Sequence, residues 1–176
     1  MPITAGSLLR EKRTMAKNKE EKTNVMRVLE QKKIAYTAHS YPHEEGVAVD
    51  GVTVAKSMGF DPAQVFKTLV ARGASGQYYV FDVPVAESLD LKKAAKAVGE
   101  KSIEMLHQKE LLPLTGYVHG GCSPVGMKKK FPTFFDASAQ KWERISVSAG
   151  TRGEMVLVEP EQLRELTSAV YTELTL

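Results

Sequence analysis

The residue of this sequence in the most unusual chemical setting is Lys67. It lies in the run VFKTLVA (65–71), where apolar and β-branched residues predict a strand that places Lys67 on the same face as Leu69. A lone lysine in such a strand either guards a sheet edge against aggregation or points inward as a functional group. A partly desolvated ammonium can hold a carbonyl or phosphate oxygen, and burial lowers its pKa so that it could instead accept a proton.

A second chemical feature is the single cysteine, Cys122, which follows His119 by three positions. Pairs of cysteine and histidine are a common source of a reactive thiolate. Catalytic partners usually come from separate elements, however, and a cysteine between Gly121 and Ser123 is also simply a small residue in a tight loop. The residues alone leave both interpretations open.

The loop around this cysteine, GGCSPVG (120–126), has a composition of its own. Gly120 and Gly121 permit positive φ angles and close approach of the backbone to a ligand, while Pro124 stiffens the exit. Such a loop can direct backbone N–H groups toward a carbonyl or carboxylate. A sharp connection between strands with no ligand is the alternative.

Several common sites do not occur in the sequence. It contains no GxGxxG after a strand, no GxxxxGK[ST], no HExxH and no paired CxxC. His39 and His43 are four positions apart, but Pro42 between them breaks the helix that a metal site with this spacing needs. We therefore expect neither a metal nor a cofactor.

Helices and strands that could position these residues are indicated by caps and periodicity. Thr23 and Asp90 are typical helix N-caps, and Gly59 and Gly99 are typical C-terminal residues. The expected helices cover 24–33, 52–58, 91–98, 108–112 and 161–170. The expected strands cover 34–39, 65–71, 77–83, 102–106, 131–137, 144–150 and 154–160.

The order of these elements indicates the fold class. Strands come as hairpins interrupted by helices, without the regular alternation of a doubly wound fold. We expect a single α/β (α+β) domain over 21–176, with a mixed, largely antiparallel sheet that curls toward a barrel and helices beside it. The segment 1–20 is expected to be a flexible basic extension, in which Met15 is a second candidate start.

Composition narrows the class of protein further. The chain has 176 residues, of which 43% are hydrophobic and 26% charged, which is typical of a globular domain that needs no disulfide. One cysteine and no apolar run long enough to span a bilayer favour the cytoplasm and exclude a membrane partner.

The net charge of +3 is divided into blocks along the chain. Segments 1–33 and 92–130 each have a net charge of +5, from nine basic against four acidic and from eight against three. Segments 34–91 and 131–176 have net charges of −4 and −3. Two basic blocks indicate either a surface for a polyanion or ordinary solvated lysines.

Five ordered segments carry a resemblance to a known family. They are HSYPH (39–43), VFKTLV (65–70), LDLKKAAK (89–96), TGYVHGGCSPVGMKKK (115–130) and VSAGTRG (147–153). With them the chain, from about residue 23 onward, resembles the YbaK/EbsC family of free-standing aminoacyl-tRNA deacylases. These proteins are related to the editing domain inserted in bacterial prolyl-tRNA synthetases, and the resemblance implies that fold.

The resemblance also implies roles for individual residues. The family's key lysine matches Lys67, which would be catalytic. The implied substrate-binding residues are Tyr41, Thr68, Gly120, Gly121, Ser123, Pro124 and Ser148. Where close relatives carry an acidic residue, this chain has Met155 beside Glu154, which leaves open what a carboxylate there would do.

The implied activity is trans-editing: release of cysteine from mischarged Cys-tRNA(Pro), or from Cys-tRNA(Cys). The thiol of the substrate's cysteine attacks the ester that joins this cysteine to the tRNA, and the cysteine is released as a thiolactone. The enzyme then needs no nucleophile, and Cys122 is dispensable. Alternatives are a deacylase for another small aminoacyl-tRNA, such as Ala-tRNA(Pro), and a non-catalytic module that binds tRNA or a synthetase.

The expected partner is mischarged tRNA, whose phosphates the basic blocks could bind. The lysines expected to do so are Lys92, Lys93, Lys128, Lys129 and Lys130. A domain of this size has little surface for reading an anticodon, so tRNA identity could come from prolyl-tRNA synthetase in a ternary complex.

Overall fold

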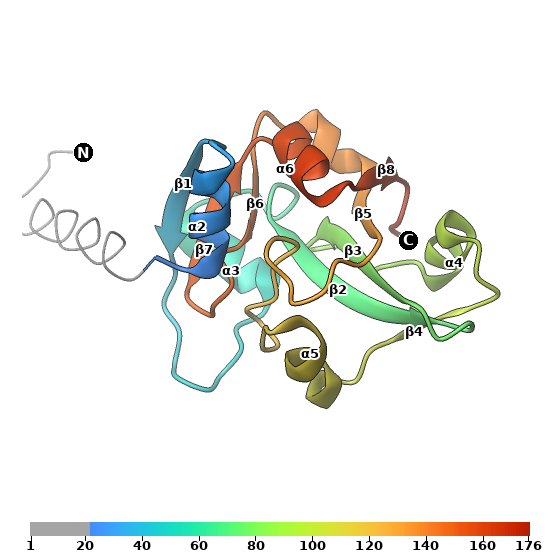
Figure 1. Ribbon diagram of the computed structural model, residues 1–176. Helices are drawn as coiled ribbons and strands as arrows, with labels where there is room; N and C mark the ends of the chain where they lie inside the picture. The colour runs from blue at the N-terminus through green and yellow to red at the C-terminus, as the bar shows by residue number, and fades with distance from the viewer. Residues whose placement is uncertain (1–21) are drawn as a thin grey trace, which may run out of the picture.

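The structure, a computed structural model, describes residues 22–176, so the expected basic extension at 1–20 lies outside the described residues. Its elements follow no regular alternation (Figure 1). The helices are α2 (Asn24–Gln31), α3 (Gly51–Met58), α4 (Leu91–Val98), α5 (Gln108–Thr115), α6 (Pro160–Thr167) and a 3-10 helix η1 (Ala137–Lys141). The strands are β1 (Tyr36–Ser40), β2 (Phe66–Gly73), β3 (Tyr78–Pro84), β4 (Ile103–Met105), β5 (Thr133–Asp136), β6 (Ile145–Ser148), β7 (Glu154–Val158) and β8 (Val170–Thr172).

The helix ends largely follow the capping residues that the sequence indicates. The Thr23 hydroxyl accepts a hydrogen bond from the Met26 amide at 3.2 Å and begins α2. The Asp90 carboxylate accepts two backbone amides and begins α4. Gly59 and Gly99 end α3 and α4 in the left-handed conformation, which glycine adopts without steric cost.

The strands divide between two sheets. One has three antiparallel strands in the order β1-β7-β6, and the other has five strands in the order β4-β2-β3-β5-β8. The hairpin of β2 and β3 is antiparallel, whereas β5 joins β3, and β8 joins β5, in parallel. The predicted α/β domain with a mixed, largely antiparallel sheet is therefore confirmed, with its strands shared between two sheets.

The two sheets meet at the start of β2. Val65 forms a parallel bridge with Ser146 of β6, and the Ser146 amide donates to the Gln64 carbonyl at 3.0 Å. At the other end of β2, β4 pairs with residues 71–73. The stretch of β2 between these two contacts is the part of the sheet that matters for the site.

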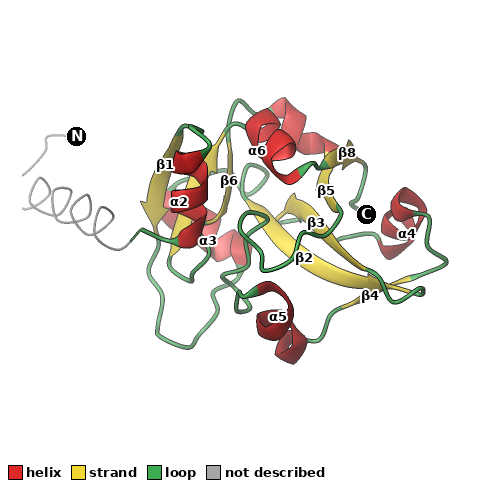
Figure 2. Ribbon diagram, in the orientation of Figure 1, coloured by secondary structure: helices red, strands yellow, loops and turns green. Residues whose placement is uncertain are grey.

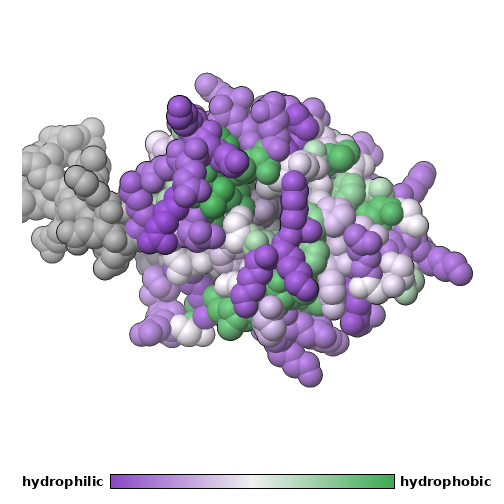
Figure 3. All heavy atoms as spheres, viewed as in Figure 1, coloured by the Kyte–Doolittle hydropathy of each residue, from purple (hydrophilic) through white to green (hydrophobic). Residues whose placement is uncertain are grey.

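Hydrophobic side chains pack in three clusters, each of which includes residues of particular helices. Figure 2 shows the helices and strands from which these residues come. The largest joins α2 and α6 to strands of both sheets. In the second, Ala94 and Ala95 of α4 pack on the strand residues Phe81 and Val83. The third includes Val54 and Ala55 of α3, Met155 of β7 and residues next to the ends of strands in both sheets. The face drawn in Figure 3 is accordingly mainly hydrophilic, with smaller hydrophobic areas between polar side chains.

The C-terminal part differs from the sequence-based expectation. The sequence predicts a helix over 161–170, but α6 ends at Thr167, and Ser168 adopts a left-handed φ of 56°. Val170 then pairs in parallel with Phe134 of β5. This tertiary pairing outweighs local helix propensity, which is only a weak preference.

None of the helices in the described residues could cross a membrane.

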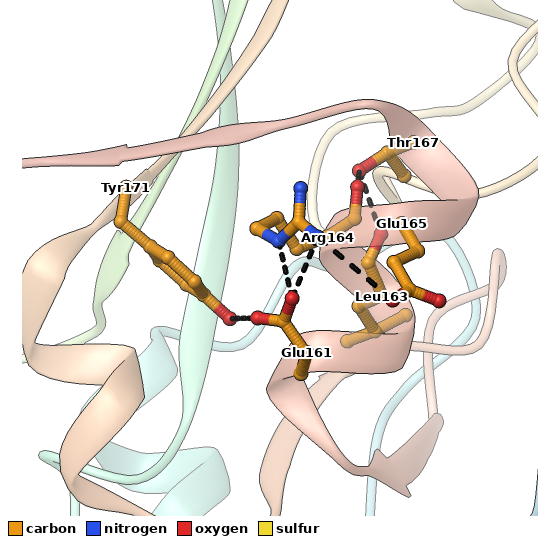
Figure 4. A network of polar contacts seen from close by, with 6 residues as sticks. All are labelled: Glu161, Leu163, Arg164, Glu165, Thr167 and Tyr171. Atoms are coloured by element: carbon orange, nitrogen blue, oxygen red, sulfur yellow. Dashed lines mark hydrogen bonds and ion pairs between the residues drawn. The ribbon is translucent and has the colours of Figure 1, made fainter.

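Helix α6 combines a buried apolar residue with an exposed polar network. Arg164 contacts Glu161 at 2.6 Å, and the Tyr171 hydroxyl donates to Glu161 at 3.3 Å (Figure 4). The neighbouring side chain of Leu163 is fully buried in the largest cluster. Exposed ion pairs contribute little to stability because water and salt screen them, whereas a buried leucine contributes much more.

We therefore predict that Leu163→Ala lowers the free energy of unfolding by about 2–5 kcal/mol. Glu161→Gln, on the same helix, should change it far less. Urea unfolding followed by circular dichroism measures both variants. A larger loss in Glu161→Gln than in Leu163→Ala would contradict this account of α6.

Candidate functional site

A cavity of about 210 Å³ opens where the two sheets and α3 meet. Five consecutive residues, 65–69, line it from the start of β2. The other lining residues are Tyr41, Val49, Asp50, Gly51, Val54, Val85, Leu111, His119, Gly120, Cys122, Ser148 and Met155. Most of these side chains are apolar, and a few polar groups converge among them, as in sites for small ligands.

Antiparallel pairing determines which backbone groups of β2 face this cavity. The Val85 amide donates to the Val65 carbonyl at 2.8 Å, and the Gly73 amide donates to the Gln77 carbonyl at 2.8 Å. Backbone direction alternates along a strand, so odd-numbered residues from 65 to 73 point their peptide groups toward β3. Even-numbered residues point theirs toward the opposite edge.

That opposite edge of β2 is open beside the cavity. The Leu106 amide donates to the Val70 carbonyl at 3.1 Å, beyond which β4 pairs with β2. Between Val70 and the bridge at Val65, this edge pairs with no strand of the described residues. The amide and carbonyl of Thr68, which lines the cavity, therefore lie on this unpaired edge, where a ligand could satisfy their hydrogen bonds.

Lys67 lines the cavity and is half-buried. Its ammonium lies 3.5 Å from the Val85 carbonyl, to which it can donate. Burial lowers the pKa of Lys67, and the Glu87 carboxylate acts in the opposite direction. Partial desolvation strengthens the attraction of this ammonium for a nearby oxygen that gains negative charge.

Asp82 lies across the hairpin from Thr68 and is not among the site residues expected from the sequence. The Thr68 hydroxyl donates to Asp82 Oδ1 at 2.6 Å, and the carboxyl is fully buried. Oδ2 has no hydrogen-bond partner among the described residues. Burial raises the pKa of Asp82 to about 8, although the Thr68 hydrogen bond opposes the rise. Asp82 is therefore mostly protonated at neutral pH. The available signal was a single carboxylate within the apolar strand pattern QYYVFDV.

The glycine loop meets the cavity through its first residue. Gly120 lines the cavity at φ +86°, a conformation that favours glycine. Gly121 approaches the turn between β6 and β7 so closely that a Cβ would lie 3.1 Å from the Arg152 amide nitrogen. Arg152 Nε also donates to the His119 carbonyl at 2.8 Å. The loop is thus held against that turn.

The rest of the predicted loop residues lie behind the cavity wall. Gly121, Ser123 and Pro124 are buried, and none of them lines the cavity. The Ser123 hydroxyl accepts the Val125 amide at 3.3 Å, and Pro124 borders a different cavity. Their placement allows them to shape the loop that presents Gly120.

Cys122 does line the cavity, but its thiol is poorly suited to attack. Burial raises the pKa of Cys122 to about 12, the charge of Asp82 adds to the rise, and a hydrogen bond with Thr115 opposes it. Only the thiolate is a good nucleophile, so a buried thiol of this kind is inert near neutral pH.

Tyr41 and Ser148 reach the cavity from the three-stranded sheet and its edge. The Tyr41 amide donates to the Gly153 carbonyl at 2.9 Å, and Tyr41 itself is buried. The Ser148 hydroxyl accepts the Gly150 amide at 3.1 Å. Met155, the cross-strand partner of Ser148, is also buried and lines the cavity. Met155 thus contributes apolar surface at the position where relatives are expected to carry a carboxylate.

The predicted tRNA-binding lysines lie outside the cavity, in two places. Lys92 and Lys93 belong to the first turn of α4, which packs beside β4 at the far end of β2 (Figure 1). Lys128, Lys129 and Lys130 follow the glycine loop and are exposed. Two of the five are tethered: Lys93 donates to the Thr175 carbonyl at 2.7 Å and Lys130 to the Ser168 hydroxyl at 3.1 Å.

Within 22–176, no three His, Cys, Asp or Glu side chains are grouped to hold a metal ion.

The burial of Asp82 makes stability depend on pH. Folding raises its pKa from 3.8 to about 8, so the folded protein retains a proton that the unfolded chain releases between these values. The stabilisation is therefore complete below pH 3.8 and is lost as the pH rises to about 8. We predict that deprotonation of Asp82 lowers the free energy of unfolding by up to about 1.4 kcal/mol for each unit by which the pH rises within that window.

Asp82→Asn removes the titration and keeps the shape of the side chain. In urea unfolding between pH 5 and pH 9, the free energy of unfolding of this variant should fall less steeply with pH than that of the wild type. Parallel curves for the two proteins would show that Asp82 titrates normally in the folded state.

Comparison with known proteins agrees with this geometry. The model of the aminoacyl-tRNA editing domain matches residues 46–166. EbsC of Enterococcus faecalis, whose name gives Cys-tRNA(Pro)/Cys-tRNA(Cys) deacylase as an inferred activity, is 44% identical over 162 residues, 92% of this chain and 98% of EbsC. A proline–tRNA ligase of Shouchella clausii is 30% identical over 115 residues, 65% of this chain but 20% of the ligase.

A solved structure is also similar over nearly the whole domain. It is described as an inferred trans-editing enzyme for prolyl tRNA synthetase, and it is 27% identical, with a TM-score of 0.75 over 86% of this chain and 94% of that one. The family resemblance drawn from the motifs is confirmed. The chain belongs to the family of aminoacyl-tRNA editing domains.

Proposed function

We propose that this protein is a trans-editing deacylase that releases cysteine from mischarged Cys-tRNA(Pro). The observation that carries the proposal is the small cavity at the open edge of β2, lined by Lys67 and Thr68 in a member of the editing-domain family. The 44% identity to EbsC, which is named for this activity, supports the choice of substrate. Cys-tRNA(Cys), also in that name, is the second substrate to test.

The cavity suits an aminoacyl ester that carries its own nucleophile. Lys67 and the backbone amide of Thr68 are donors that could stabilise an ester oxygen as it gains negative charge. The apolar side chains could hold a small amino-acid side chain in a folded conformer close to its carbonyl. Cys122, the one thiol in the wall, is kept protonated by burial, so the protein offers no competing sulfur nucleophile there.

The proposed reaction is an intramolecular transfer of the acyl group. The cysteine sulfur of the substrate attacks the ester carbonyl carbon, a carbon–sulfur bond forms and the carbon–oxygen bond to the ribose breaks. The thiol proton ends on the ribose oxygen, and the products are a thiolactone and free tRNA. Water later opens the thiolactone to cysteine.

The tRNA would lie on the surface outside the cavity. Lys128, Lys129 and Lys130 follow the loop whose first residue, Gly120, lines the cavity, so they could meet the phosphates of an acceptor end that enters there. Lys92 and Lys93 lie at the other end of β2 and would meet a different part of the tRNA. The proposed partner for tRNA selection is prolyl-tRNA synthetase, in a ternary complex.

We predict that Lys67→Met lowers the rate of cysteine release from Cys-tRNA(Pro) by about 10²–10³-fold, because one donor to the developing oxyanion is removed. Cys122→Ala should retain most of the activity. Both rates are measured under single-turnover conditions with labelled Cys-tRNA(Pro), with circular dichroism to confirm folding.

The control substrates separate this reaction from its alternatives. Ala-tRNA(Pro) has no thiol and should be released slowly; rapid release of alanine would require an activated water and would overturn the substrate-thiol mechanism. Inactivity of folded Cys122→Ala would point to an enzyme thiolate. Binding of tRNA without any release by the wild type would make the protein a binding module.

A second prediction concerns the exposed lysines after the glycine loop. The triple variant Lys128→Ala/Lys129→Ala/Lys130→Ala should bind tRNA more weakly and reduce the slope of log affinity against log salt by about one for each phosphate that is no longer neutralised. Lys141→Ala, an exposed lysine on η1, is the matched control and should leave the slope unchanged. Equal slopes for the triple variant and the wild type would remove these lysines from the tRNA surface.

A further inference from the structure

The cavity carries a carboxylate as well as an ammonium. Asp50 lines it from the start of α3, and Lys67 lines it from β2. Among the lining residues, Asp50 is the one acidic side chain and Lys67 the one lysine or arginine. The wall of the cavity therefore includes one acidic and one basic residue, which come from different elements.

The Asp50 carboxylate is held in a defined position. Oδ1 accepts the Thr53 amide at 3.1 Å, and Oδ2 accepts the Thr53 hydroxyl at 2.6 Å. These hydrogen bonds lower the pKa of Asp50 below its ordinary value, so the group stays ionised. Each carboxylate oxygen can accept a second hydrogen bond, and the residue is exposed. Asp50 can thus bind a cation without leaving its cap.

We propose that Asp50 binds the α-ammonium group of the aminoacyl ester, so that the site selects esters with a free amino group. This inference rests on the proposed function. An aminoacyl ester has a cation on its α-carbon and, one bond away, a carbonyl whose oxygen gains negative charge during the reaction. Asp50 and Lys67 match these two groups in sign, and together they fix the orientation of the ester.

The chemical class that this arrangement excludes is N-acylated esters. A formylated, acetylated or peptidyl ester has a neutral amide in place of the ammonium, so Asp50 would lose its partner and remain a charge beside a polar group that cannot neutralise it. The site would thus act on aminoacyl-tRNA and spare tRNA that carries a blocked or growing chain.

The test compares Cys-tRNA(Pro) with N-acetyl-Cys-tRNA(Pro), which keeps the reactive thiol. The full-length wild type should prefer the free amine by about 10- to 100-fold in kcat/KM, the range for a hydrogen bond to a charged group. Asp50→Asn should lose that preference by slowing the free-amine substrate alone. Asparagine is as good an N-cap as aspartate, so α3 should remain intact.

Asp61→Asn is the matched control. Asp61 is also exposed and accepts a backbone amide, that of Ala63 at 2.9 Å, but it does not line the cavity. Its variant should keep the wild-type preference. An equal loss of preference in Asp61→Asn would overturn the assignment to Asp50.

The remaining outcomes are distinguishable. Two results with an active wild type would refute the role of Asp50 and leave the proposed function intact. In one, Asp50→Asn keeps the preference for the free amine; in the other, Asp50→Asn is slowed equally on both substrates. A wild type that releases neither substrate would refute the proposed function itself.

Discussion

The site depends on one unpaired stretch of backbone, the edge of β2 opposite β3. The bridge from Val65 to Ser146 joins the sheets at one point, and β4 is only three residues long, so neither neighbour covers the edge between them. Peptide groups need hydrogen-bond partners, and a sheet that leaves them unpaired beside a cavity creates a place for a polar ligand. The division of the strands into two sheets is therefore what opens the site.

The charges at and near the cavity depend on how deeply each carboxyl is buried: Asp50 lines the cavity, whereas Asp82 is hydrogen-bonded to the lining residue Thr68. Asp82, fully buried below Thr68, is mostly protonated at neutral pH. An ionised Asp82 there would repel an ester oxygen as it gains negative charge. Asp50 is exposed and stays ionised, where a negative group can attract a cation. Two residues of the same type thus differ in charge because one lies in an apolar interior and the other at a helix end.

The local features of this molecule are predictable from the sequence because neighbouring residues cause them. A capping aspartate at Asp90, a left-handed glycine at Gly99 and the hairpin of β2 and β3 each depend on neighbouring residues, and Lys67 stands out as a single charge in an apolar strand. The parallel pairing of β5 with β3 and β8 joins segments distant in sequence. Nothing local indicates such pairings, and the local pattern accordingly predicts helix at the start of β8.

The same distinction applies to the site residues. Placing Lys67 and Ser148 in one cavity requires the two sheets to meet, which only the resemblance implied. Asp82 was missed because its importance arises from burial and from Thr68 across the hairpin. Asp50 was missed because an aspartate at a helix N-cap is ordinary, and only the fold shows that this residue lines the cavity. Gly121 and Pro124 belong to the motif but lie behind the cavity wall. A sequence motif does not show which of its residues contact a ligand and which only hold the loop in place.

The proposed reaction, in which the substrate supplies the nucleophile, affects selectivity against the correct aminoacyl ester. Cysteine and proline are close in size. A pocket that distinguishes two side chains by about one methylene group favours one over the other by only about 1–3 kcal/mol of binding free energy. If the reacting sulfur comes from the substrate, a prolyl ester can enter the cavity and still survive, because it has nothing with which to attack. The cavity then need only orient the ester and stabilise its oxygen, which is what Lys67 and the open edge of β2 can do. An activated cysteine in the wall would remove this protection, and burial keeps Cys122 from becoming one.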